Sequence, residues 1–125
     1  MNERIMIVDD DPSIIYTVRA VLDGASMGSV TANGGLECLE HLANGFSGLI
    51  LLDVMMPGMN GWQTAEEIVA QGYASNTLIC MLTAQADPDE GMEEIKAYIV
   101  DYITKPFTPD DLLDRVRQYI SLLPV

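Results

Sequence analysis

The chain has 125 residues, of which 49% are hydrophobic, enough for the core of one domain. Nineteen acidic residues against six basic ones give a formal net charge of −13. Because affinity for a phosphate backbone comes from clustered Lys and Arg, this balance argues against nucleic acid as a partner. No apolar run approaches the roughly 18 residues of a membrane helix, and no secretory signal is evident. We therefore expect a cytoplasmic protein that does not bind membranes.

The first predicted strand, residues 4–8, ends at a run of three acids that begins at Asp9. The last of these acids, Asp11, precedes Pro12, and a capping side chain before a proline is typical of a helix N-terminus. We therefore expect Asp11 to cap a helix over residues 12–23 rather than to bind a metal ion.

The middle of the chain alternates between strands and helices. In order, it contains a weak strand over residues 27–31, a helix ending near residues 44–45, a strong strand over residues 48–52 and a helix ending near Gly72. Asn33 and Asn60 are the expected caps of the two helices, and Leu36 and Leu42 lie on the apolar stripe of the first. Asp53 directly follows the strong strand, so it is expected at that strand's carboxyl end.

The last part of the chain repeats this alternation. In order, it contains a strand over residues 77–82, a helix that begins near residues 87–88, a strand over residues 102–104 and a helix from Pro109 towards Leu123. Thr83 follows the first of these strands and Lys105 follows the second. The stripe of the first helix includes Met92 and is expected to reach Ile99.

This alternation predicts an α/β fold of the (βα)5 type, a three-layer sandwich with helices on both faces of a parallel sheet. We expect the doubly wound, flavodoxin-like strand order 2-1-3-4-5. Ligands of such sheets bind at the carboxyl ends of the strands. The polar residues that follow the strands are therefore expected to converge at one end of the sheet, and they are Asp9, Asp10, Asp53, Thr83 and Lys105.

The predicted cluster suits a divalent cation and a phosphoryl group. Three carboxylates brought together repel one another unless a cation is present, and Mg²⁺ prefers carboxylate, water and phosphate oxygens. Asp53, at the end of the central strand, is placed to attack phosphorus and form an aspartyl phosphate. The Thr83 hydroxyl can donate to a phosphoryl oxygen, and the Lys105 ammonium can pair with a carboxylate and then with the phosphate. Pro106 is a candidate for a cis peptide bond.

Taken singly, each of these residues has an ordinary explanation. The pair Asp9-Asp10 could be a solvated loop, Asp53 a turn residue, Thr83 a strand-end hydroxyl and Lys105 a surface lysine. The joint placement of all of them at strand ends favours the functional interpretation.

The remaining polar candidates have weaker support. Cys38 and Cys80 show no spacing typical of a disulfide framework or a zinc site, so we expect both to be small core residues in a reducing compartment. The single histidine, His41, lies late in a predicted helix, and we expect a surface or helix-end role rather than a catalytic one.

Four segments resemble the receiver domain of two-component response regulators, the chemotaxis-regulator-like family. They are residues 5–10, 51–61, 81–84 and 101–107. The order and spacing of these motifs cover essentially the whole chain. The resemblance implies one receiver domain over residues 1–125 with no output domain, while the abrupt ending also fits a piece cut from a longer regulator.

The resemblance implies a role for each site residue. Asp53 would accept the phosphoryl group from the phosphohistidine of a sensor kinase or a histidine phosphotransfer protein. Asp10 and Asp53 would hold Mg²⁺ directly, Asp9 would act partly through water, and the main-chain carbonyl of Met55 would be another ligand. Met55 and Gln85 occupy the two positions that tune hydrolysis of the aspartyl phosphate in the family.

The resemblance also implies a switch. Thr83 and Lys105 would contact the phosphoryl oxygens, and Thr83 and Tyr102 would move on phosphorylation. Their movement would reshape the face made by the fourth helix, fifth strand and fifth helix, which would bind a downstream effector or a second copy of the chain. Many receivers carry a small, glycine-containing segment just before the last strand, where this chain has Tyr98 and Ile99. We expect these two side chains either to extend the binding face or to pack inward.

Two other classes remain open. A Mg²⁺-dependent phosphohydrolase with an aspartyl-phosphate intermediate usually needs an acid two residues after the nucleophile, where this chain has Met55. A flavin carrier on a similar fold needs a phosphate-cradling loop rich in Ser, Thr or Gly after the first strand, where this chain has acids. The leading interpretation is therefore a phosphorylation-dependent signalling module and not a dedicated turnover enzyme.

Overall fold

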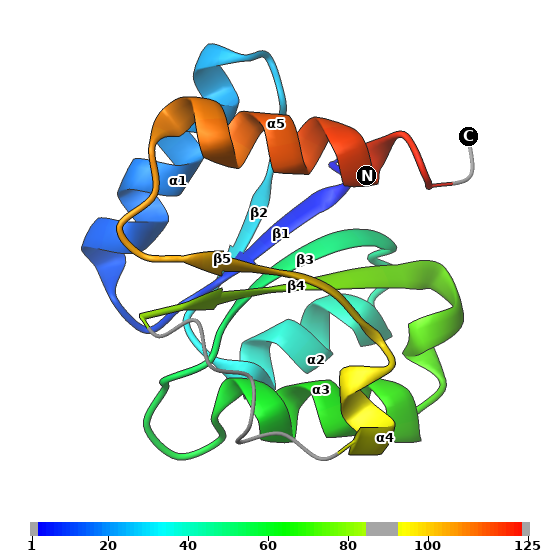
Figure 1. Ribbon diagram of the computed structural model, residues 1–125. Coiled ribbons are helices and arrows are strands. Elements are labelled where there is room, and N and C mark those ends of the chain that lie inside the picture. The colour runs from blue at the N-terminus through cyan, green and yellow to red at the C-terminus, as the bar shows by residue number, and fades with distance from the viewer. Residues whose placement is uncertain (1–2, 85–92, 124–125) are drawn as a thin grey trace.

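The computed structural model describes residues 3–84 and 93–123 and contains one parallel sheet (Figure 1). The strand order is β2-β1-β3-β4-β5, which confirms the predicted flavodoxin-like arrangement. The strands are β1 (Ile5–Val8), β2 (Val30–Ala32), β3 (Gly48–Asp53), β4 (Thr77–Thr83) and β5 (Ile99–Thr104). The helices are α1 (Pro12–Gly24), α2 (Gly35–Ala43), α3 (Gly61–Ala70), α4 (Glu93–Lys96) and α5 (Pro109–Ile120), with a short 3-10 helix, η1 (Tyr73–Asn76), before β4.

The helices form layers on both faces of the sheet. Helices α1 and α5 cover one face, and α2, α3 and α4 cover the other (Figure 1). Because successive strand residues point to opposite faces, each face has its own apolar core. The core under α1 and α5 includes Ile7, Val18, Leu51 and Leu112, and the core under the other three helices includes Met6, Ile50, Trp62 and Ile68. None of the helices in residues 3–84 and 93–123 combines the length and apolar character that crossing a membrane requires.

Three helices begin at the residues that the sequence predicts. Asp11 accepts a backbone hydrogen bond from the first turn of α1, as expected for a cap. Thr108 does the same for α5. Asn60 and Gln63 form a reciprocal capping box at the start of α3, with both hydrogen bonds at 2.9 Å. These local bonds satisfy N–H groups that the helices themselves cannot pair.

The predicted details of β2 and α2 were wrong. Strand β2 begins at Val30 rather than at residue 27. The N-cap of α2 is Gly34, which makes no side-chain hydrogen bond, so Asn33 is not the cap. The side chain of Leu36 is exposed, while Cys38 joins Leu42 in the core. The spacing of the leucines in α2 thus predicted the wrong buried face, because the helix buries the smaller Cys38 and exposes Leu36.

Strand β5 is longer than predicted. It begins at Ile99, which therefore belongs to the strand and not to α4, since α4 ends at Lys96. The branched side chains of Ile99 and Val100 suit a strand better than a helix. The predicted helix start at residues 87–88, and Met92 with it, lie outside the described residues.

A bulge interrupts β5 where it pairs with β4. Ile79 lies opposite Ile99, but its neighbour Cys80 lies opposite Asp101, so Val100 is an extra residue. Asp101 consequently turns towards α5. There, its Oδ2 accepts hydrogen bonds from Arg115 at 2.8 Å and from the Tyr119 hydroxyl at 2.6 Å.

The capping box of α3 yields the first prediction. Asn60→Ala removes the side chain that accepts from Gln63 N–H, so we expect it to lower the free energy of unfolding by about 1 kcal/mol. Asn33→Ala is the matched control and should change stability by less, because the Asn33 side chain caps no helix. Urea denaturation at equilibrium measures both. Equal effects of the two substitutions would contradict the assignment of the caps.

Candidate functional site

The predicted site residues lie at one end of the sheet. Asp53 and Thr83 are the last residues of β3 and β4, Asp9 and Asp10 directly follow β1, and Lys105 directly follows β5. The strands are parallel, so all of these positions share the carboxyl edge. The structure thus brings together residues that are up to 96 positions apart in the sequence.

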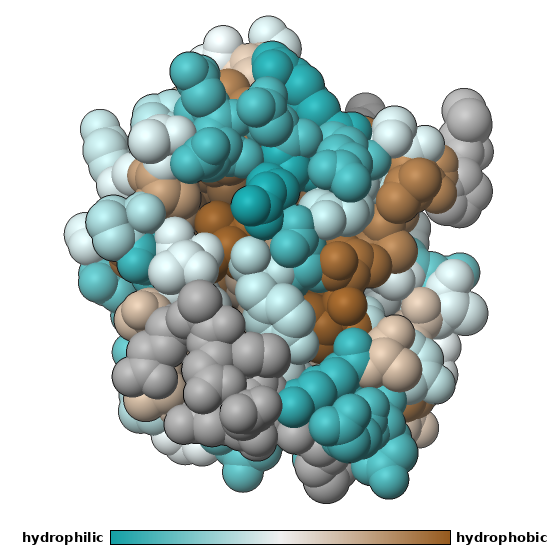
Figure 2. All heavy atoms as spheres, in the orientation of Figure 1, coloured by the Kyte–Doolittle hydropathy of each residue, from teal (hydrophilic) through white to brown (hydrophobic). Residues whose placement is uncertain are grey.

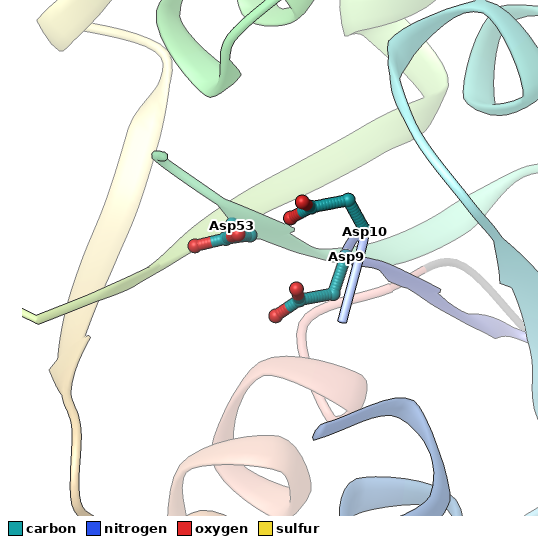
Figure 3. Close-up of side chains that lie close together, drawn as sticks. All are labelled: Asp9, Asp10 and Asp53. Carbon is teal, nitrogen blue, oxygen red and sulfur yellow. The ribbon is translucent and has the colours of Figure 1, made fainter. Parts of the chain in front are cut away.

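The three acids form a compact group. One carboxylate oxygen from each of Asp9, Asp10 and Asp53 lies within 4.8 Å of the other two. Figure 3 shows the side chains of Asp9 and Asp10 extending from the end of β1 towards the side on which Asp53 lies. Asp9 and Asp53 are only 2% and 5% exposed, whereas Asp10 is open to solvent. The group therefore has two buried carboxylates and one on the surface.

Lys105 connects the two buried carboxylates. Its Nζ donates to Asp9 Oδ2 at 3.1 Å and to Asp53 Oδ1 at 3.2 Å. The main chain holds it in place, because the Lys105 N–H donates to the Thr83 carbonyl oxygen at 2.7 Å. The following peptide bond, to Pro106, is cis, which confirms that expectation. Lys105 therefore lies within the acidic group instead of projecting freely from the surface.

The hydrogen bonds differ between the two buried acids. Both oxygens of Asp9 have a partner, because Oδ1 accepts from the Asp11 N–H at 2.9 Å and Oδ2 accepts from Lys105. Asp53 instead receives two bonds on the same oxygen, Oδ1, from Lys105 and from the Met55 N–H at 3.3 Å. Within the described residues, no hydrogen bond ends on Asp53 Oδ2. Oδ2 is therefore the less engaged of the two Asp53 oxygens among these residues.

Burial and charge shift the pKa values at this site. Burial, and then the neighbouring Asp9 carboxylate, raise the pKa of Asp53 to about 6, although the Lys105 ammonium acts in the opposite direction. Burial alone would lower the pKa of Lys105, but the carboxylates of Asp53 and Asp9 together outweigh it and raise that pKa. Lys105 therefore carries a positive charge. That charge is not enough to offset the effect of burial and of the Asp9 carboxylate on the pKa of Asp53.

The donor set suits a hard divalent cation. Three carboxylates within 4.8 Å of one another supply the oxygen ligands that Mg²⁺ prefers, and Asp10 leaves the group accessible from solvent. A bound cation would also add positive charge beside Asp53, which would lower its raised pKa. These residues can therefore hold a metal ion beside the Asp53 carboxylate.

The structure adds residues that the sequence did not single out. The ring of Trp62, in the first turn of α3, lies 6.3 Å from the ring of Tyr102, the predicted switch residue. Arg115 donates at 3.3 Å to the Tyr102 carbonyl oxygen as well as to Asp101. The sequence contains a lone tryptophan and an aspartate next to Tyr102, but only the packing of α3 and α5 against β5 relates Trp62 and Arg115 to Tyr102. Gln85 lies outside the described residues.

Comparison with known proteins identifies the family. Residues 5–117 match the family described as response regulator receiver domain. The chain therefore belongs to the receiver domains of two-component response regulators, and the fold and resemblance predicted from its sequence are confirmed.

Similar proteins include regulators that are about twice as long as this chain. The DNA-binding response regulator MtrA of Mycolicibacterium smegmatis is 36% identical over 94% of this chain and 50% of its own length. The regulatory protein VanRB of Enterococcus faecalis is 38% identical over 94% of this chain and 52% of its own length. The chain thus spans about half the length of the curated relatives it matches. The name of the first relative conflicts with the expectation that nucleic acid is not a partner.

Solved structures agree with the fold. A CheY-like receiver from Methanospirillum hungatei JF-1 has a TM-score of 0.89 and 41% identity, with 94% of each chain covered. The response regulator TrrA of Thermotoga maritima, solved in complex with Mg(2+)-BeF, has a TM-score of 0.80 and 29% identity over 94% of this chain and 98% of its own.

The raised pKa of Asp53 yields the second prediction. An unfolded aspartate has a pKa of about 3.9, so between about pH 4 and pH 6 the unfolded chain loses a proton that the folded chain keeps. Stability from this group therefore falls as the pH rises through that window and stays reduced above it. In metal-free buffer at pH 8, Asp53→Asn should raise the free energy of unfolding by about 1–2 kcal/mol, and this gain should vanish below pH 4.

Urea denaturation across this pH range, with a chelator present, is the measurement. Asp10→Asn is the control, because Asp10 is exposed and neutralising it should change stability less. A variant Asp53→Asn that is no more stable than the wild type at pH 8 would contradict the electrostatic account.

Proposed function

We propose that this chain is a phosphorylation-dependent signalling receiver in which Asp53 accepts a phosphoryl group. One observation carries the proposal: the Lys105 ammonium lies within 3.2 Å of the Asp53 carboxylate, which also belongs to a three-acid group. A nucleophile, a cation seat and a phosphate-binding ammonium thus lie side by side. Membership of the receiver family supports the same function.

The chemistry follows from this arrangement. Asp53 Oδ2 attacks the phosphorus of a partner's phosphohistidine, the P–N bond breaks, and the imidazole leaves with its electron pair. Lys105, bonded to Oδ1 beforehand, exchanges a carboxylate oxygen for a phosphoryl oxygen. The hydroxyl of Thr83, at the end of the adjacent strand, donates to another.

We propose Mg²⁺ as the cation, held by Asp10 and Asp53, by Asp9 partly through water, and by the Met55 carbonyl oxygen. When bound, it supplies positive charge for the incoming phosphoryl group. The donor set supports this choice, as does the fact that the similar TrrA was solved in complex with Mg(2+)-BeF.

The same site is poorly suited to rapid turnover. Met55, two residues after Asp53, is 69% exposed and has no proton to donate. A hydrolase with an aspartyl intermediate would need an acid or base there to release the phosphate. The proposed role is therefore to keep the phosphoryl group as a signal rather than to hydrolyse it.

We place the partner-binding surface on α4, β5 and α5. Figure 2 shows an apolar strip between the hydrophilic surfaces over α5 and α4, where β5 crosses the front of Figure 1. Tyr98 is 46% exposed at the start of this region, while Ile99 is partly buried against the core under α4. Of the two alternatives for this pair, Tyr98 fits the surface role and Ile99 fits inward packing. The expected occupants are a downstream effector or a second copy of the chain.

The name of the MtrA relatives bears on nucleic acid as a partner. A chain with a formal charge of −13 has little attraction for a phosphate backbone. We therefore place any DNA contact of a longer protein containing this chain in segments other than residues 1–125. The proposed partners of these residues are a sensor kinase or phosphotransfer protein and an effector protein.

The third prediction concerns the phosphoryl adduct. Incubation with Mg²⁺ and a small acyl phosphate or phosphoramidate should add one phosphoryl group, seen by intact mass, because the donor replaces the partner's phosphohistidine. Asp53→Ala should abolish the adduct, whereas Asp11→Ala should retain it, since Asp11 caps α1. Removal of Mg²⁺ with a chelator should also prevent it.

Two other outcomes would contradict the proposed receiver. Many turnovers of the donor without a detectable adduct would favour the phosphohydrolase. A wild-type protein that forms no adduct and binds no Mg²⁺ would refute both the receiver and the hydrolase.

A further inference from the structure

The partner-binding surface over α4, β5 and α5 has an apolar strip in its middle (Figure 2). At the start of β5, Tyr98 is 46% exposed and residues 99–100 are half-buried. Leu122, just after α5, is 66% exposed. It lies seven residues after Arg115, which donates to a carboxylate of β5, so it continues the side of α5 that faces β5. Apolar side chains of α5 and β5 are therefore available to a partner.

Acidic side chains flank this strip on both sides. Glu93 and Glu94 are exposed on α4, and Asp111 and Asp114 are exposed on α5. Asp111 lies four residues before Arg115 and thus on the same side of α5, towards β5. A partner that covers the strip therefore meets carboxylates at both of its borders.

The cations on this side of the molecule are already paired within the chain. Lys96 Nζ of α4 lies 3.6 Å from the Glu93 carboxylate, and Arg115 of α5 lies 2.8 Å from that of Asp101. Arg117 is two residues further along α5, which is about 200° around the helix from Arg115, so it faces away from β5. The other acids of α4 and α5 consequently leave this surface with a net negative charge.

The edge of β5 does not suit the addition of a partner's strand. Tyr102 already donates its N–H to Asp101 Oδ1 at 2.8 Å, and its carbonyl oxygen accepts from Arg115 at 3.3 Å. The bulge at Val100 also breaks the regular spacing that strand pairing requires. A partner must therefore dock through side chains, as an amphipathic helix does when it lays its apolar face on a surface.

A second copy of the chain is poorly matched to this surface. In a symmetric pair, both copies use the same patch, so the acidic borders of one copy approach those of the other. Like charges placed together oppose association, and each copy has a formal net charge of −13. A basic partner would be attracted by the same carboxylates.

We infer that the partner-binding surface receives an amphipathic helix of a different protein, whose apolar stripe lies between flanks rich in Lys and Arg. The inference rests on the proposed function, which gives the location of the surface. The apolar stripe covers the strip over β5, and the basic flanks face the acids of α4 and α5. Binding of this kind weakens as the salt concentration rises.

The test uses three synthetic peptides of about 14 residues, or four helical turns, made of Leu, Ala and a charged residue. The first has a Leu stripe between Lys flanks, the second has the same residues in scrambled order, and the third has Glu in place of Lys. Fluorescence anisotropy measures their affinity without and with saturating Mg²⁺ and beryllofluoride, a mimic of the phosphoryl group, because the proposed switch would reshape the surface. In at least one of the two conditions, the first peptide should bind about tenfold more tightly than either of the others.

Matched variants separate this surface from the general acidity of the chain. Leu122→Ser should weaken binding of the first peptide about three- to tenfold. Leu36→Ser is its control, since Leu36 is equally open, at 69% exposed, but lies on α2. Asp111→Asn should weaken binding about two- to fivefold, and Glu40→Gln, which removes the same charge from the exposed surface of α2, should have a smaller effect.

Backbone amide shifts of the isotope-labelled wild type show where the first peptide binds. Shifts centred on α4, β5 and α5 would support the inference, and shifts centred on α3 or on the acidic group at Asp53 would overturn it. Equal affinity of the scrambled peptide, or no binding of the first peptide in either condition, would also overturn it. So would a dimer, seen by sedimentation, that Leu122→Ser dissociates.

Failure of the inference differs from failure of the proposed function. A wild type that forms no phosphoryl adduct in the intact-mass experiment would refute the proposed receiver. The titration without beryllofluoride needs no phosphoryl chemistry, so its result bears on the surface alone.

Discussion

The site depends on the Lys105 ammonium lying between the carboxylates of Asp9 and Asp53. Two buried acids cannot remain ionised side by side without nearby positive charge. Lys105 supplies it across β4, which separates β5 from β3 in the sheet. Strands lie about 4.8 Å apart, so the reach covers roughly two strand spacings and requires a long side chain. The contact therefore needs three features together. They are this strand order, strands that end at the same edge, and a side chain as long as lysine.

That constraint also relates the site to the surface. The main chain of Lys105 bonds to the Thr83 carbonyl oxygen, so the ends of β4 and β5 cannot shift independently. On the other side of Asp53, the Gly61 contact holds α3 against the backbone of β3. Under the proposed function, a phosphoryl group on Asp53 would act on two elements, β5, which contains Tyr102, and α3, which contacts it. The site and the proposed binding face are joined directly by β5, because Lys105 follows this strand and Tyr102 lies in it.

The sequence predicted the sheet and the convergence of site residues because both follow from chain-local patterns. Apolar strand runs and the polar residue after each are readable without tertiary information. The errors have a common cause. Ile99 fits the helical stripe of α4 and also the pleat of β5, and only pairing with Ile79 decides between them. Asn33 is a good cap by type, but the chain turns one residue later, at Gly34. The Trp62–Tyr102 contact joins two helix–strand units, which no local pattern specifies.

The bulge in β5 affects how this edge of the sheet can pair with other strands. Strands at the edge of a sheet present unpaired backbone groups that can recruit further strands. Here the extra residue Val100 breaks the regular spacing of that edge, and the side chains of Asp101 and Arg115 occupy the N–H and carbonyl oxygen of Tyr102. The opposite edge strand, β2, has only three residues. Among the described residues, neither edge therefore offers a long regular template for pairing with another strand.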